Sequence, residues 1–108
     1  KKLKEEYGVN LNIIKGDFGD ISTIWSRPVD ILHIDGFHTY DAVSSDFKNW
    51  EKFLSDESVV LFHDVELFEG VNKFFTELDG FKLIRSGSCG LGLWTKNINT
   101  FEKIRMVV

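Results

Sequence analysis

The chain reads Val29-Asp-Ile-Leu-His-Ile-Asp-Gly-Phe-His-Thr-Tyr-Asp-Ala-Val43 in its first half. Residues 29–34 are almost continuously apolar, which is typical of a strand covered on both faces. From Tyr40 onward, apolar residues instead recur at the spacing of one face of an amphipathic helix. The change from a strand pattern to a helix pattern predicts one strand–helix unit of an α/β fold.

The helix and the strand that follow it are marked clearly. Apolar side chains recur every three or four residues, at Tyr40, Val43, Phe47, Trp50 and Leu54. Thr39 or Asp41 is the expected N-cap of this helix. A second buried strand is expected at Ser58–Phe62, ending at His63-Asp64. These elements continue the strand–helix alternation of an α/β fold.

The flanking segments carry weaker patterns. We expect the end of a helix at Lys1–Tyr7, a short strand at Val9–Ile14, helical turns at Ile21–Trp25, a helix at Val71–Leu78 with Gly80 as its C-cap, strands at Phe81–Arg85 and Leu91–Thr95, and a helix at Asn99–Val108. The glycine-containing connection between the last two strands is typical of an antiparallel hairpin. The alternation predicts a mostly parallel sheet that ends in this hairpin, within a single domain at residues 1–108.

Composition excludes several classes of partner. The formal net charge is -4 and the pI is about 5.3, so non-specific binding to nucleic acid or to acidic membranes is not expected. No apolar run approaches the roughly 20 residues of a membrane span. The N-terminus does not resemble a secretory signal. The single cysteine, Cys89, fits a reducing compartment, and we expect a cytoplasmic protein.

Polar residues follow each predicted strand. Asp17 comes after the first, Asp35 and His38 after the second, and His63-Asp64 after the third. Ligands of parallel sheets bind outside the carboxyl ends of the strands. Asp35 and Asp64 are therefore expected to aim their carboxylates at one point, where oxygen ligands suit Mg²⁺ or Ca²⁺. A neutral His38 beside them would accept a proton from a substrate hydroxyl.

Other interpretations of these residues stay open. Aspartate and histidine just after a strand often cap helices or bond to loop backbone. Gly16-Asp17 is either a simple turn or an acceptor for the exocyclic amine of adenine, with Phe18 against the ring face. A two-histidine-one-carboxylate iron site, as in an oxygenase, requires His63 or His33 to face the crevice. His33 lies inside an apolar run, and we expect it to be buried and structural.

As an ordered set, these motifs resemble one family. It is the class I S-adenosylmethionine-dependent methyltransferase group that includes macrolide-sugar O-methyltransferases and cephalosporin-hydroxylase-like proteins. The resemblance spans about Val9 to Lys96 and rests on residues 29–43, Asp46-Phe-Lys-Asn-Trp, Val59-Val-Leu-Phe-His-Asp-Val, Gly70-Val-Asn-Lys-Phe-Phe and Gly90-Leu-Gly-Leu.

The resemblance implies a Rossmann-like sheet and a set of roles. Asp35 and Asp64 would hold a divalent metal, usually Mg²⁺, and His38 would be the general base. Asp17, Phe18 and Asp35 would face the cofactor, S-adenosylmethionine. The acceptor would be a hydroxyl of a small molecule or sugar.

Two departures from the family pattern qualify these roles. Relatives commonly carry Asp-Gly-Asp-His, whereas this chain has Phe37 at the third position. The glycine-rich loop and the first two strands of the family have no counterpart in these residues, so we expect the chain to correspond to the C-terminal two-thirds of the domain. We therefore expect this piece to be inactive alone.

The same departure leaves one edge of the sheet open. Val29–Ile34 would lack its neighbouring strand, and an exposed apolar edge invites pairing with another chain. We expect one of two outcomes: either the Val9–Ile14 strand shifts next to Val29–Ile34, or two copies pair edge to edge as a homodimer. Two alternatives to the methyltransferase remain: a non-catalytic Rossmann-like assembly module of a larger glycan-modifying protein, and a metal-dependent hydrolase or oxygenase.

Overall fold

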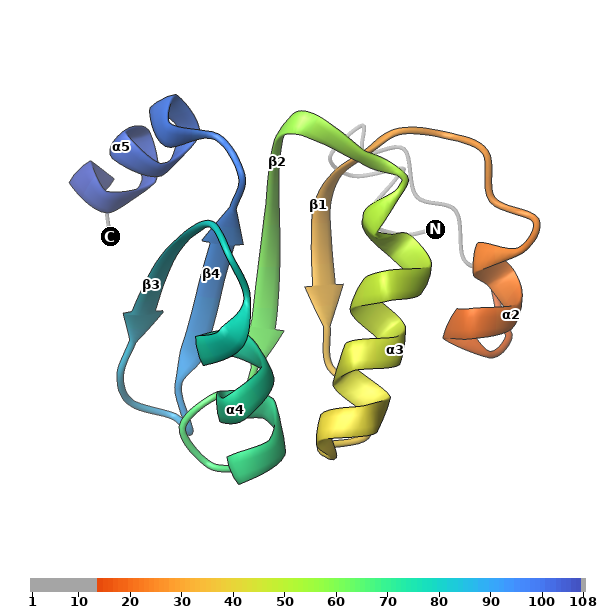
Figure 1. Cartoon of the computed structure of the whole chain (residues 1–108), viewed down its shortest axis with the longest axis horizontal. Coiled ribbons are helices and arrows are strands. Elements are labelled where there is room, and N and C mark those ends of the chain that lie inside the picture. Colours follow the sequence, from red (N-terminus) through yellow and green to blue (C-terminus); the bar gives the residue numbers. More distant parts are fainter. Residues whose placement is uncertain (1–13, 108) are drawn as a thin grey trace, which may run out of the picture.

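The computed structural model describes residues 14–107 (Figure 1). Its elements are α2 (Phe18–Ser22), β1 (Val29–Ile34), α3 (Tyr40–Glu51), β2 (Leu54–His63), α4 (Glu69–Glu77), β3 (Phe81–Arg85), β4 (Leu91–Thr95) and α5 (Ile98–Val107). The helix expected at Lys1–Tyr7 lies outside the described residues, as does the strand expected at Val9–Ile14 apart from its last residue.

The described strands form one sheet in the order β1-β2-β4-β3. β1 and β2 are parallel, whereas β4 runs antiparallel to both β2 and β3. The hairpin expected from β3 and β4 is confirmed. The expectation of a mostly parallel sheet is wrong for these strands, because β4 inserts between β2 and its hairpin partner and is antiparallel on both sides.

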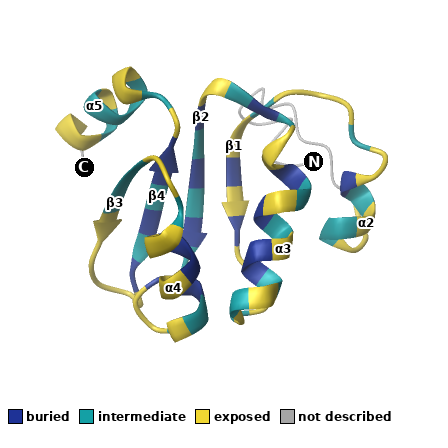
Figure 2. Cartoon of the chain, in the orientation of Figure 1, coloured by how far each residue is buried: buried dark blue, intermediate teal, exposed yellow. Residues whose placement is uncertain are grey.

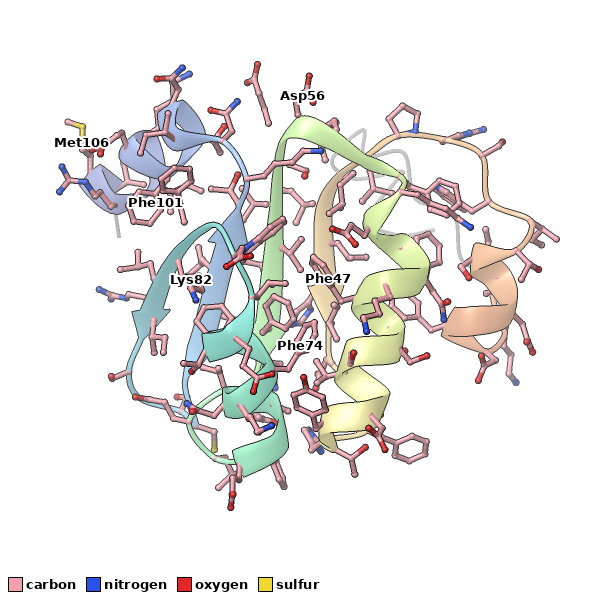
Figure 3. The ribbon with its side chains drawn as sticks, in the orientation of Figure 1. Phe47, Asp56, Phe74, Lys82, Phe101 and Met106 are labelled. Carbon is pink, nitrogen blue, oxygen red and sulfur yellow. The ribbon has the colours of Figure 1, made fainter. Side chains whose placement is uncertain are left out.

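Helices α3 and α4 cover one face of the sheet (Figure 1). Figure 2 shows buried residues in β2 and β4 and along one side of each helix, while the outer sides are exposed. Phe47 of α3 and Phe74 of α4 point into the space between the helices and the strands (Figure 3), with their ring centroids 5.7 Å apart. Phe62 of β2 is fully buried beneath both rings. The core is therefore built largely from aromatic rings.

The opposite face of β1 is open in the described structure. Ile31 is 68% exposed and His33 is also exposed, whereas Leu32 and Ile34 point into the core. The expectation that β1 is covered on both faces is wrong, and so is the expectation of a buried His33. The cause is the two-residue alternation of a strand, because the described helices α3 and α4 cover only the face of Leu32 and Ile34. Helix α5 packs farther along the sheet, where Phe101 contacts Phe81.

Several element boundaries differ from expectation. Helical turns occur at Phe18–Ser22 rather than Ile21–Trp25, because the Asp17 carboxylate accepts hydrogen bonds from the backbone N–H groups of Gly19 and Asp20. Leu54 begins β2 rather than ending α3, because it pairs with Val29.

Of the two predicted helix caps, the N-cap of α3 is confirmed and the C-cap of α4 is wrong. Thr39 is the N-cap of α3, and its hydroxyl accepts a hydrogen bond from the N–H of Ala42 at 3.1 Å. Helix α4 is capped at Leu78 and not at Gly80. Gly80 instead has φ +138°, and an added Cβ would lie 2.3 Å from the Trp94 indole nitrogen. The glycine therefore serves the turn into β3 rather than the helix end.

Within residues 14–107, every helix is too short or too polar to cross a lipid bilayer.

Candidate functional site

The candidate site lies where β1 and β2 end. Ile34 pairs with Phe62 in the parallel register, so the residues that follow each strand emerge at the same edge. Helices α3 and α4 both begin at this end of the molecule (Figure 1). The edge therefore gathers Asp35 and His38 from one connection and His63 and Asp64 from the other. This is the place at which open α/β sheets bind ligands.

Asp64 is at the centre of this group. Its Oδ2 atom lies 3.0 Å from Nε2 of His38 and 3.0 Å from Nδ1 of His63. Oδ1 of Asp35 lies 3.3 Å from the same His63 nitrogen and 4.0 Å from Nε2 of His38. The structure therefore brings together Asp35, His38 and Asp64, the three residues that strand-end reasoning selected, and their chemical roles stay predictions.

Asp64 is held in an unusual backbone conformation. Its φ is +59°, in the left-handed region that non-glycine residues rarely adopt. Its carbonyl oxygen accepts hydrogen bonds from the N–H groups of Leu67 and Phe68, which close a tight turn after β2. Such conformations cost about 1–3 kcal/mol and cluster at functional sites. The turn holds the Asp64 side chain, only 14% exposed, toward the two histidines.

His38 is oriented by a ring and by a carboxylate. Its imidazole stacks on Phe68 with centroids 3.9 Å apart and planes 15° apart. The 3.0 Å contact with Asp64 has hydrogen-bond geometry, with Nε2–H as the donor and Oδ2 as the acceptor. In that tautomer the neutral ring keeps its lone pair on Nδ1. A histidine held in this way can act as a proton acceptor.

Gly70, in the first turn of α4, lies very close to the backbone around His38. A Cβ placed on Gly70 would lie 2.5 Å from the Tyr40 nitrogen, 3.0 Å from the Thr39 carbonyl carbon and 3.2 Å from the His38 oxygen. All three are backbone atoms, which cannot move without moving the turn itself. The absence of a side chain at Gly70 therefore permits the approach that brings Phe68 onto His38.

We expect Gly70→Ala to lower the free energy of unfolding by about 1–3 kcal/mol, the usual cost of overpacking. The direction of the change is informative, because replacing glycine by alanine inside a helix otherwise raises the stability of a protein by about 0.5–1 kcal/mol. Urea denaturation measures the change. Thr76→Ala, at an exposed position of the same helix, is the control and should stay within about 0.5 kcal/mol. A Gly70→Ala protein more stable than the wild type would contradict the close approach.

His63 is the site residue that sequence reasoning left out of its chosen set. Its ring stands on the open face of the sheet, edge-on to His33 with centroids 5.7 Å apart. Although the side chain is 42% exposed, its Nδ1 atom is buried and has no hydrogen-bond partner among the described residues. The distances to Asp35 and Asp64 are short enough for hydrogen bonds, but their angles are not suitable. The one available signal was its place at the end of a strand next to β1.

Two of the residues expected to face the cofactor, Asp17 and Phe18, lie beside an open groove. Asp17 caps α2 through its Oδ1 atom, which is the structural role weighed for it. Phe18 stacks on Trp50 with centroids 4.8 Å apart. Both line an open groove of about 550 Å³, which also reaches Gly36 and Phe37 beside Asp35. The groove therefore runs from α2 to the strand-end site.

Asp46 adds a second carboxylate to this groove. Burial raises the pKa of its carboxyl group, and the nearby charge of Asp17 raises it further. Within residues 14–107, neither Asp17 nor Asp46 forms an ion pair, so the groove wall concentrates hydrogen-bond acceptors. Such a wall suits a ligand that presents N–H or O–H donors.

Comparison with known proteins adds two findings. A family model described as a methyltransferase domain matches residues 1–65, which contain Asp17, Asp35, His38 and Asp64. The uncharacterized protein y4gI of Sinorhizobium fredii is 48% identical over 61 residues, which make up 54% of this chain. The matched segment spans 7% of the length of that relative.

Proposed function

The chain belongs to the methyltransferase-domain family, and from this premise we propose that it is an S-adenosylmethionine-dependent O-methyltransferase acting on a hydroxyl of a small molecule or sugar. The observation that carries the proposal is the convergence of Asp35, His38 and Asp64 at the carboxyl edge of two parallel strands. O-methylation needs a hydroxyl placed and deprotonated in front of the methyl donor, and these residue types supply both functions.

The carboxylates suit a divalent cation. Asp35 Oδ1 and Asp64 Oδ2 both lie within 3.3 Å of one buried nitrogen, so they face a common point. Two carboxylates directed at one point repel each other unless a proton or a cation lies between them. Mg²⁺ or a similar ion held there would polarise the acceptor hydroxyl and make it more acidic.

His38 is proposed to take the proton of the acceptor hydroxyl. Asp64, 3.0 Å from Nε2, would stabilise the imidazolium that forms. S-adenosylmethionine, when bound, would supply the methyl group, and His38 would leave the acceptor oxygen deprotonated in front of it. Besides moving the proton, the protein mainly positions the two reactants, which is worth several kcal/mol of the barrier.

The groove between α2 and α3 is the proposed place of the cofactor. Both cap hydrogen bonds of Asp17 use Oδ1, which leaves Oδ2 for the exocyclic amine of adenine. Phe18 lines the groove, and Gly36 at its other end directly follows Asp35, which we propose to lie nearest the reacting atoms. We also propose that the protein acts in the cytoplasm, since its single cysteine, Cys89, is free and exposed.

Pairing of two copies through β1 remains our proposal for assembly. Among the described strands, β1 has a neighbour on one side only. An exposed edge is a template for pairing with another chain. Nucleic acid and membranes are not proposed as partners, because the formal net charge is -4.

A second candidate, a metal-dependent hydrolase or oxygenase, is favoured by one observation. His63 faces the crevice beside Asp35 and Asp64, as a mixed histidine–carboxylate centre requires. The family match favours the methyltransferase over this alternative.

Isothermal titration of the complete native protein with S-adenosylmethionine, with and without Mg²⁺, tests the proposal. We expect saturable binding. Asp17→Asn should weaken it, because asparagine still caps α2 but lacks the negative charge. Asp20→Asn, at an exposed residue of α2, is the matched control and should bind like the wild type. Absence of binding under both conditions would overturn the proposal.

A further inference from the structure

We propose that His63 is a third ligand of the ion, so that the site takes a divalent transition metal such as Mn²⁺, Fe²⁺ or Zn²⁺ in preference to Mg²⁺. The inference deepens the proposed function, since it concerns the metal assumed there. It assigns His63 a role in the proposed methyltransferase, whereas the sequence patterns considered this residue only for an oxygenase-type iron site.

The spacing of the three donor atoms is that of ligands around one ion. Nδ1 of His63 lies 3.0 Å from Asp64 Oδ2 and 3.3 Å from Asp35 Oδ1, and one donor atom of each of the three residues lies within 4.8 Å of the other two. Two ligands about 2.1 Å from an ion are about 3.0 Å apart at right angles and about 3.4 Å apart in a tetrahedron. A single ion can therefore contact all three without a large movement.

The orientation of His63 distinguishes this arrangement from an ordinary ion pair. In an ion pair, the N–H of the ring would point at one carboxylate oxygen. Here Nδ1 is buried and lies close to two carboxylates, yet it makes no hydrogen bond with any described residue. A buried polar atom without a partner costs about 1–3 kcal/mol. A bound cation would satisfy the nitrogen and both carboxylates together.

The fold holds this nitrogen in place. His63 is the last residue of β2 and pairs with Leu91 of β4, so its backbone belongs to the sheet. Its ring rests edge-on against His33. Ligands carried by regular elements keep their geometry better than ligands carried by loops.

His38 is not part of the proposed ligand set. Its Nε2 makes an aligned hydrogen bond to Asp64 and lies 4.0 Å from Asp35. The aligned bond leaves His38 to act on the proton of the acceptor. The two histidines thus have different roles: His63 binds the ion, and His38 accepts the proton of the acceptor hydroxyl.

The donor set decides which ions are preferred. Mg²⁺ prefers oxygen ligands and keeps several waters, whereas imidazole suits zinc, copper, iron and nickel. One imidazole nitrogen with two carboxylates therefore favours a first-row transition metal. Among such ions the affinity rises from Mn²⁺ through Fe²⁺ and falls again after Cu²⁺.

Calorimetry on the complete native protein, with MnCl₂ and MgCl₂ titrated separately, tests the inference. Wild type should bind Mn²⁺ at least about tenfold more tightly than Mg²⁺. His63→Ala should lose at least about 10–100-fold in Mn²⁺ affinity, the loss caused even by partners outside the coordination sphere. His33→Phe keeps a ring against His63 while it removes the His33 imidazole, and it should bind Mn²⁺ like the wild type.

Pulsed electron paramagnetic resonance of bound Mn²⁺ gives a second readout. Wild type and His33→Phe should show the coupling of a directly bound ¹⁴N nucleus, and His63→Ala should not. Circular dichroism melting curves establish that each variant is folded. Equal affinities for Mn²⁺ and Mg²⁺, or a nitrogen coupling that persists in folded His63→Ala, would overturn the inference.

These outcomes are separable from those of the proposed function. If S-adenosylmethionine binds but no divalent ion does, the metal inference fails and the methyltransferase stands. If Mn²⁺ binds with nitrogen coupling while S-adenosylmethionine does not bind, the ligand assignment stands and the methyltransferase fails.

Discussion

A Phe47→Ala variant is expected to lose about 3–5 kcal/mol of stability, the usual cost of removing a buried aromatic ring. Phe47 is 2% exposed, and its ring contacts those of Phe62, Phe74 and Trp94 at centroid distances of 6.0, 5.7 and 5.2 Å. It therefore joins α3 to β2, α4 and β4 at once. Because several rigid rings line the resulting cavity, the surroundings cannot collapse easily to fill it.

Urea denaturation followed by tryptophan fluorescence measures this loss. Lys48→Ala is the matched control, since Lys48 is the next residue of α3 and is exposed. Its free energy of unfolding should change by no more than about 0.5 kcal/mol. A loss below about 1 kcal/mol in Phe47→Ala would mean that the ring is not packed as described. Single domains commonly have 5–15 kcal/mol in total, so the variant is expected to be close to unfolding.

Apolar patterning was sufficient to predict most elements of the fold. The bounds of β1, β3 and β4 agree with the structure because each is a short apolar run between polar or glycine residues. The pairing of the strands was harder to predict from the sequence. The antiparallel insertion of β4 beside β2 depends on contacts between residues far apart in sequence, which local patterns do not encode.

His33 shows why burial is harder to predict than secondary structure. An apolar run indicates a strand, but it does not state how many faces of that strand other elements cover. Leu32 and Ile34 are buried, whereas Ile31 and His33 are exposed on the opposite face. Only the positions of α3 and α4 decide between the two cases.

The site could be predicted in part because it depends on topology. Parallel neighbours end at one edge, so Asp35 and Asp64 had to approach each other once β1 and β2 paired. The contribution of His63 depends on the direction of one ring nitrogen, which follows from side-chain packing against His33. The left-handed turn at Asp64 was also not predicted, since aspartate tolerates positive φ but most aspartates do not adopt it.

A His38→Ala variant is expected to lower kcat for methyl transfer by about 10²–10⁴-fold, the usual contribution of a general base. The affinity for S-adenosylmethionine should not change, because the proposed cofactor groove is lined by Asp17 and Phe18 and not by His38. The measurement is the release of S-adenosylhomocysteine with the best acceptor found for wild type in a panel of sugars and phenols. His33→Phe is the control, since this exposed residue lies outside the proposed catalytic group and the variant keeps a ring against His63.

The size of the loss separates two ways of activating the acceptor. If the ion alone makes the hydroxyl acidic enough, removing His38 should reduce the rate by less than about tenfold, which would contradict its role as a base. If His38 takes the proton, the rate of His38→Ala should rise with pH as hydroxide replaces the lost base. Asp64→Asn should then resemble His38→Ala in rate, because the imidazolium would lose the carboxylate 3.0 Å from its Nε2. Asp64→Asn should also bind the metal more weakly, whereas His38→Ala should keep the metal affinity of the wild type. This difference would show that His38 takes the proton and that Asp64 binds the ion.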